Sequence, residues 1–294
     1  MCKIAAVAAV NDENRDNVWA MMICLGDIMS RTQRDGLGYA AFDKSGKIFG
    51  ERWLENSLSF TDFSANPRLT AAKIAKNYNF FGEKVLRKEA QAIILHARAA
   101  TCGRGLANTH PFVNDEQNVT SAIIHNGIIA NHEEHIKKTS TCDSEILVHL
   151  YEKFKISENL ANIRSLVNEL VGWFTVLTLS KDSTGRPIID VYTDAPRLSS
   201  YFVKELGTRV YSTSSYDIEE AAEILGFEVT DRQTIRSETA YRLDALTGAT
   251  LEEISFAEEK ADDSFETARN VYVAEGNFDD EKFRNNYLKR STDI

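Results

Sequence analysis

The feature of this sequence that most constrains its fold is the order of its strand-like and helix-like segments. Short segments rich in β-branched and aromatic residues follow one another in runs, and helical segments interrupt these runs in pairs. A doubly wound parallel sheet requires a helix between nearly every two strands. The order therefore predicts an α+β chain with largely antiparallel sheets covered by helices. The strand-like segments are 3–10, 38–43, 47–54, 91–98, 119–125, 173–179, 188–192, 201–203 and 209–212.

Helical periodicity and one turn signal complete the expected framework. From Val18 to Met29, apolar residues recur at the spacing of an amphipathic helix. Ser45-Gly46 separates two strand-like segments, and glycine tolerates the positive φ of a tight turn. We therefore expect a helix packed on the first sheet, followed by a β-hairpin. Further helices are expected over 144–154, 160–170 and 218–225.

Composition allows a large core and argues against some partners. Of the 294 residues, 43% are hydrophobic, so the chain can fold as one large domain or two small ones. A formal net charge of -10 repels a phosphate backbone. The sequence has no run of about 18 apolar residues and no secretory start. We expect no direct nucleic-acid binding, no membrane association and a cytoplasmic location.

The end of the sequence differs from the rest. After Phe256 it becomes charged and poor in aliphatic residues, first through Glu258 to Asp263. We therefore predict one principal domain over residues 1–256 and a charged C-terminal extension over residues 257–294.

Cys2 is a candidate nucleophile because of its position. A small second residue permits removal of Met1, which would leave Cys2 with both a thiol and an α-amino group. A free α-amine has an ordinary pKa of about 7.7 to 8.0 and can accept the thiol proton. Taken alone, Cys2 is more often an ordinary small residue that opens a strand. Other parts of the chain must decide between the two interpretations.

Three further motifs follow in a fixed order. His96-Ala97-Arg98-Ala99-Ala100-Thr101 and His125-Asn126-Gly127-Ile128-Ile129-Ala130-Asn131-His132 each begin at the end of an apolar strand, and Cys142-Asp143-Ser144-Glu145 opens a helix. Together with Cys2, this order resembles the class II glutamine amidotransferases, most closely the glutaminase domain of glucosamine-6-phosphate synthases. The resemblance covers roughly the first two hundred residues. It implies a four-layer αββα sandwich, the fold of N-terminal-nucleophile hydrolases.

The resemblance assigns catalytic roles to three residues. Cys2 would attack the side-chain amide of glutamine and form a γ-glutamyl thioester. The Asn126 side chain and the Gly127 backbone N–H would stabilise the oxyanion. The resemblance implies no metal and no organic cofactor.

Three more residues would bind the substrate. Arg98 can grip an α-carboxylate with two parallel charge-assisted hydrogen bonds. Thr101 would add a hydroxyl contact at the same end, and Asp143 would pair with the α-ammonium group. This set would select a glutamyl substrate.

The resemblance implies an enzyme that releases glutamate and ammonia from glutamine. Nothing after the glutaminase-like part is as large as a synthase domain, so we expect the ammonia acceptor on a separate protein. The chain departs from the synthases at Ala99 and Cys102, where they carry tryptophan and histidine.

Several alternatives remain open from the sequence. The enzyme could cleave another γ-glutamyl compound, or the fold could serve as a noncatalytic interaction module. Arg98 and Asp143 could form a structural ion pair, and Asn126-Gly127 could close a hairpin. The six histidines lack the supporting ligands of a metal site and are better explained as core or surface residues.

Overall fold

The computed structural model describes residues 2–54, 90–100, 103–135, 139–195 and 197–257. Two antiparallel sheets form its centre. The first sheet contains β1 (Lys3–Val7), β2 (Gly36–Phe42), β3 (Ile48–Trp53), β4 (Ala92–Arg98), β9 (Ser199–Val203), β10 (Thr208–Ser212) and β11 (Val229–Thr234). The second contains β5 (Phe112–Val113), β6 (Ser121–Ile129), β7 (Gly172–Lys181), β8 (Pro187–Thr193), β12 (Thr239–Asp244) and β13 (Thr250–Ser255).

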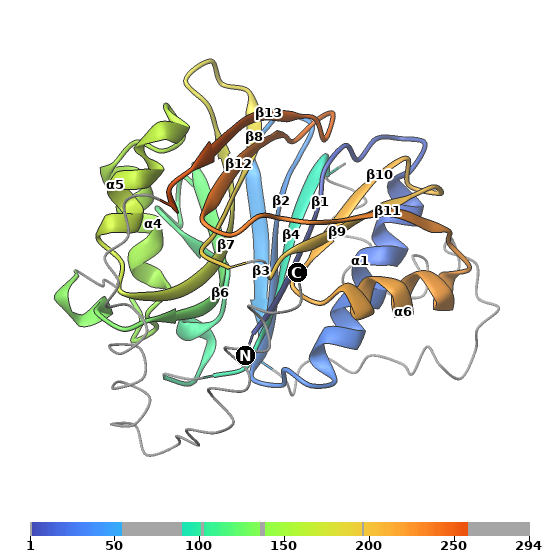
Figure 1. Ribbon diagram of the computed structural model, residues 1–294. Coiled ribbons are helices and arrows are strands. Elements are labelled where there is room, and N and C mark those ends of the chain that lie inside the picture. The colour runs from blue at the N-terminus through green and yellow to red at the C-terminus, as the bar shows by residue number, and fades with distance from the viewer. Residues whose placement is uncertain (1, 55–89, 101–102, 136–138, 196, 258–294) are drawn as a thin grey trace.

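Helices cover the outer face of each sheet (Figure 1). On the first sheet lie α1 (Arg15–Ser30) and α6 (Ser215–Leu225), which also pack against each other. Beside the second sheet lie α4 (Glu145–Lys153) and α5 (Ile163–Asn168). The short 3₁₀ helices are η3 (Leu106–Asn108), η4 (His132–Glu134) and η5 (Leu160–Asn162). The predicted four-layer αββα arrangement is confirmed.

Strand order in the two sheets places the N-terminal strand centrally. The first sheet runs β11-β9-β10-β1-β4-β2-β3, and the second runs β13-β12-β8-β7-β6-β5. β1 is therefore hydrogen-bonded on both sides, to β10 and to β4. The chain around Cys2 is tied into a sheet, as the apolar segment after it predicts.

Apolar side chains fill three layers between these elements. One core lies between α1, α6 and the first sheet, another between α4, α5 and the second sheet, and a third between the two sheets. Ile4 and Ala6 of β1 belong to the inter-sheet core, whereas Ala5 and Val7 belong to the core beneath α1. This alternation along a strand determines which side chains enter the inter-sheet space.

Most predicted elements are present, with shifted ends. The predicted helices at 144–154 and 218–225 correspond to α4 and α6, and 160–170 divides into η5 and α5. The hairpin turn is present, with Gly46 at φ 73°. The first strand ends at Val7 because Ala9 adopts φ 58°, which a continuing strand cannot contain.

Two findings differ from the sequence interpretation. The hairpin alternative for Asn126-Gly127 is wrong, because β6 continues through both residues, which pair with Thr175 and Phe174 of β7. β5, β11, β12 and β13 were not expected as strands. β5, β11 and β13 lie at sheet edges, and β11 and β13 expose much of their surface, so their sequences lack a clear apolar alternation. β12 is an inner strand whose buried residues include Arg242 and Asp244, so its apolar pattern is interrupted by charges.

Two further predictions from the sequence were a domain boundary after residue 256 and the absence of membrane association. Of the predicted extension 257–294, only Ala257 lies within the described residues, so the boundary after residue 256 remains a prediction. Among the described helices, none has the length and apolar character needed to cross a membrane.

Candidate active site between the sheets

The strand register brings Cys2 and Arg98 to the same end of the first sheet. Lys3 pairs with Ala97 across β1 and β4, so Cys2 lies at the level of Arg98 one residue further along. Ile4 and Ile94 point into the inter-sheet core, and the two-residue period of a strand places Cys2 and Arg98 on the same face. Sequence periodicity alone could not show this, because it does not reveal which strands are neighbours.

The Cys2 side chain is half-buried at the start of β1. Its Sγ donates to the carbonyl oxygen of Ala99 at 3.5 Å, and burial raises the pKa of the thiol to about 11. The nearby charges of Arg98 and Asp143 act on this pKa in opposite directions, which shows that both groups lie within electrostatic reach. A thiol with this pKa stays protonated at neutral pH. Nucleophilic attack from Cys2 would therefore need a base.

Arg98 ends β4 and is 2% exposed. Its Nη2 donates to the carbonyl oxygen of Gly103 at 2.9 Å. Asp35 ties down the chain on either side: its backbone N–H donates to the Arg98 carbonyl, and its carboxylate accepts from Ala100 N–H at 2.7 Å. The guanidinium is thus held at the strand end beside Cys2.

Asn126 comes from the opposite sheet. β6 contacts both β1 and β4 across the inter-sheet space. Ala122 and Ile124 belong to the inter-sheet core, and the same alternation directs Asn126 toward the first sheet. Asn126 is 4% exposed, yet its Oδ1 has no hydrogen-bond partner within the described residues. A buried amide in this state is unusual for a purely structural residue.

Gly127 is required by the close packing of β6 on β7. A Cβ at this position would lie 2.1 Å from the carbonyl oxygen of Trp173 and 2.5 Å from Nε2 of His125. Any larger residue would displace the backbone next to Asn126. The backbone around the predicted oxyanion site is therefore fixed by sterics.

Asp143 precedes α4 and is 5% exposed. Its Oδ2 accepts from Ile129 N–H at 2.8 Å, and its Oδ1 accepts from the Ser144 hydroxyl at 3.2 Å. The first contact attaches the start of α4 to the end of β6. Asp143 therefore shares its supporting strand with Asn126.

The remaining predicted site residue, Thr101, lies outside the described residues. Of the other five, Cys2 directly precedes β1, Arg98 ends β4, Asn126 and Gly127 lie within β6, and Asp143 precedes α4. Within the described part of the chain, no group of three or more His, Cys, Asp or Glu side chains is arranged to hold a metal ion.

Three buried histidines adjoin the site, and their grouping was not evident in the sequence. The rings of His96 and His110 stack with centroids 3.8 Å apart, and His110 lies 6.5 Å from His125. Burial lowers the pKa of all three, for His96 to about 3, so each ring is neutral at physiological pH. The two nitrogens of His110 have no hydrogen-bond partner in the described structure. These are core histidines, as the sequence favoured.

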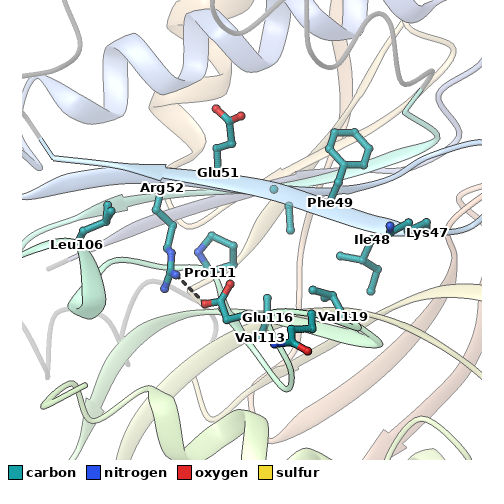
Figure 2. Close-up of a pocket in the computed structure, with 13 residues that line it drawn as sticks. Lys47, Ile48, Phe49, Glu51, Arg52, Leu106, Pro111, Val113, Glu116 and Val119 are labelled. Carbon is teal, nitrogen blue, oxygen red and sulfur yellow. Dashed lines mark hydrogen bonds and ion pairs between the residues drawn. The ribbon is translucent and has the colours of Figure 1, made fainter. Parts of the chain in front are cut away.

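One cavity lies apart from these residues (Figure 2). It has a volume of about 430 Å³ and lies between β3 and the chain from Pro111 to Val119. The ion pair between Arg52 and Glu116, at 2.8 Å, crosses it. None of the five predicted site residues that the structure describes lines it.

Comparison with solved structures identifies the fold. The chain is similar to a structure described as the allosteric regulatory enzyme of purine biosynthesis, with a TM-score of 0.58 and 16% identity, covering 87% of this chain and 49% of that one. It is also similar to glutamine phosphoribosylpyrophosphate amidotransferase from B. subtilis, with a TM-score of 0.57 and 16% identity, covering 93% of this chain and 56% of that one. The chain has the fold of a glutamine amidotransferase. The predicted resemblance and the predicted N-terminal-nucleophile sandwich are confirmed at the level of the fold.

The similarity covers only part of the matched enzymes. This chain spans about half the length of the two enzymes it matches. No protein-family model matches the sequence, and no curated protein matches it significantly.

Proposed function

We propose that this chain is a glutaminase of the class II glutamine amidotransferase type, with Cys2 as its nucleophile. The observation that carries the proposal is the adjacency of Cys2 and Arg98 on the face of the first sheet toward which the buried Asn126 of the second sheet is directed. The Oδ1 of Asn126 has no hydrogen-bond partner within the described residues. The shared fold supports the same class of reaction.

The proposed reaction starts with removal of Met1. The freed α-amine of Cys2 accepts the thiol proton, which the raised pKa of the buried thiol otherwise retains. The thiolate attacks the glutamine amide carbon, and the oxyanion accepts hydrogen bonds from the Asn126 side chain and the Gly127 backbone N–H. The α-ammonium group returns the proton to the departing ammonia. Water then hydrolyses the γ-glutamyl thioester and releases glutamate.

Substrate binding follows from two opposite charges, Arg98 and Asp143, that lie within electrostatic reach of Cys2. Arg98 would hold the α-carboxylate, with Thr101 beside it, and Asp143 would hold the α-ammonium group. Glutamine is the proposed substrate, and an ammonia-accepting synthase subunit on a separate protein is the proposed partner. The cytoplasmic location and the absence of a cofactor remain predictions.

Intact-protein mass spectrometry with a glutamine-like diazoketone tests the nucleophile. The processed protein should lack Met1 and gain one adduct, the diazoketone minus N₂, together with glutamate release from glutamine. The Cys2→Ala variant should show neither. The Cys24→Ala variant is the matched control, because Cys24 is a buried thiol of α1 and should not be modified.

Insertion of one glycine between Met1 and Cys2 tests the base. Processing then leaves the α-amine on the wrong residue, and turnover should be lost while the fold persists. A wild-type protein that forms no adduct and releases no glutamate would refute the proposal. Faster turnover of another γ-glutamyl amide than of glutamine would change the substrate and retain the mechanism.

A further inference from the structure

The carboxylate of Asp143 is held by two structural elements at once. Ile129 N–H of β6 donates to Oδ2 at 2.8 Å, and the Ser144 hydroxyl, at the start of α4, donates to Oδ1 at 3.2 Å. Because Asp143 is 5% exposed, solvent contributes little to its orientation. The two contacts leave the carboxylate with a narrow range of rotamers.

A histidine of β6 supports the second contact. His125 Nδ1 lies 2.8 Å from the Ser144 hydroxyl oxygen. An ionised carboxylate only accepts hydrogen bonds, so the single Ser144 proton goes to Asp143. The Ser144 oxygen then accepts from His125 in the tautomer that carries its proton on Nδ1, and also from Cys142 Sγ at 3.6 Å. The contacts form a directed chain from the imidazole through the hydroxyl to the carboxylate.

The ring of His125 is suited to this role. It is 1% exposed, and burial lowers its pKa, so it stays neutral at physiological pH. Asp143, Asp194 and the backbone of Trp173 oppose this shift, and Arg197 adds to it. The buried, neutral ring is held at a fixed position against the Ser144 hydroxyl.

Ser144 gives up a common structural role in making these contacts. It occupies the N-cap position of α4, where serine usually accepts a hydrogen bond from a backbone N–H of the first turn. Here its side chain makes no capping hydrogen bond and is engaged with Asp143 and His125 instead. The hydroxyl therefore serves the carboxylate and not the helix.

We infer that Ser144 and His125 are positioning residues that fix the Asp143 carboxylate for the α-ammonium group of the substrate. The inference rests on the proposed function for its substrate, but the orientation of Asp143 is a structural claim of its own. β6 then carries both ends of the reaction: Asn126 faces the reacting amide, while His125 and Ile129 set the group that binds the amino end.

Steady-state kinetics with paired variants tests the chain. Ser144→Ala and His125→Leu should raise the KM for glutamine about 10-fold to 100-fold, the range expected for a lost hydrogen bond to a charged group, and change kcat less than about threefold. Ser144→Thr keeps the hydroxyl, and His125→Asn keeps an N–H near the Nδ1 position. Both should restore KM to within about threefold of the wild-type value.

Crystal structures and calorimetry separate failure of this inference from failure of the proposed function. The Asp143 carboxylate should rotate in a structure of Ser144→Ala, and glutamine affinity should fall by the same factor when Ser144→Ala is placed in a Cys2→Ala background. An unchanged Asp143 rotamer, or an unchanged KM in an active enzyme, would overturn the inference. A rotated Asp143 in a wild type that neither binds nor cleaves glutamine would refute the function and retain the positioning role.

Discussion

Two buried polar clusters differ in how completely their hydrogen bonds are made. On the helix side of the second sheet, Asp190 accepts from Arg242 Nε and Nη2, both at 2.8 Å, and from the Tyr151 hydroxyl at 2.6 Å. Between the sheets, Asn126 Oδ1 and both nitrogens of His110 have no partner within the described residues. Both clusters are shielded from solvent.

The difference distinguishes buried polar groups that stabilise the fold from buried polar groups that are available to a ligand. A satisfied network stabilises the fold because every desolvated group recovers its hydrogen bonds from protein. An unsatisfied amide oxygen weakens the fold, and the retention of this one on the inter-sheet face is better explained by a ligand whose N–H or O–H donates a hydrogen bond to it. Variants in the first cluster should therefore change stability, and variants in the second should change activity.

The largest expected effect on stability is at Asp190. The Asp190→Ala variant leaves Arg242 buried without its carboxylate and should lose about 3–5 kcal/mol of unfolding free energy. Urea denaturation measures the loss, and activity per folded molecule should be retained. Replacing Asp190 and Arg242 together by leucine should restore most of the stability, because no buried charge then lacks a partner. A double variant as unstable as Asp190→Ala would contradict this explanation.

The next effect is on activity, at Asn126. The Asn126→Ala variant should lower kcat about 10²-fold to 10³-fold, as expected for a lost oxyanion donor. Its unfolding free energy should stay close to that of the wild type, because no hydrogen bond to protein is lost from Oδ1. The matched control is Asn131→Ala, whose amide donates to Glu169 and accepts from Val171 N–H. The Asn131→Ala variant should lose stability and keep its kcat. A loss of kcat in Asn131→Ala together with a loss of stability alone in Asn126→Ala would contradict the difference between the two clusters.

Acid should destabilise the histidine group. The pKa values of His96 and His110 are lowered in the folded state, so the unfolded state binds more protons as the pH falls below about 6.5. Each histidine should then remove about 1.4 kcal/mol of stability per pH unit, down to about pH 3 for His96. Stability is therefore lost as the pH falls and is regained as it rises.

The His110→Phe variant measures this linkage. Its unfolding free energy, measured from pH 6.5 to 4, should fall less steeply than that of the wild type. The difference in slope should correspond to about one fewer proton taken up on unfolding. The groups that act on His110 are His96, His125, Arg98 and Arg52. Equal slopes for His110→Phe and the wild type would show that His110 does not set the acid sensitivity.

The smallest effect is expected at the surface. Lys153, near the end of α4, forms an ion pair with Glu169 at 3.0 Å, and both side chains are more than a third exposed. The Lys153→Ala variant should change the unfolding free energy by less than about 1 kcal/mol. A loss as large as that at Asp190 would mean that burial does not separate strong from weak charge pairs in this protein.

Much of the fold was accessible from local sequence patterns. The apolar segment after Cys2 and the spacing from Val18 to Met29 predicted β1 and α1, because both are encoded by neighbouring residues. β11 and β13 were missed because edge strands do not bury a regular face. Asn126-Gly127 has a turn composition, but pairing along β7 keeps it in a strand. Local propensity gives way to a partner strand in such cases.

The sequence by itself determined the residue types available for chemistry and their order along the chain: a cysteine at position two, an arginine and an asparagine at strand ends, and an aspartate at a helix start. Tertiary structure alone decided that Cys2 and Arg98 lie side by side and that Asn126 lies on the face of the second sheet directed toward the first. It also decided that His125 supports Asp143 through Ser144. The physical reason is that strand pairing and sheet packing join residues far apart in the chain, whereas sequence periodicity reports only the face that a residue occupies.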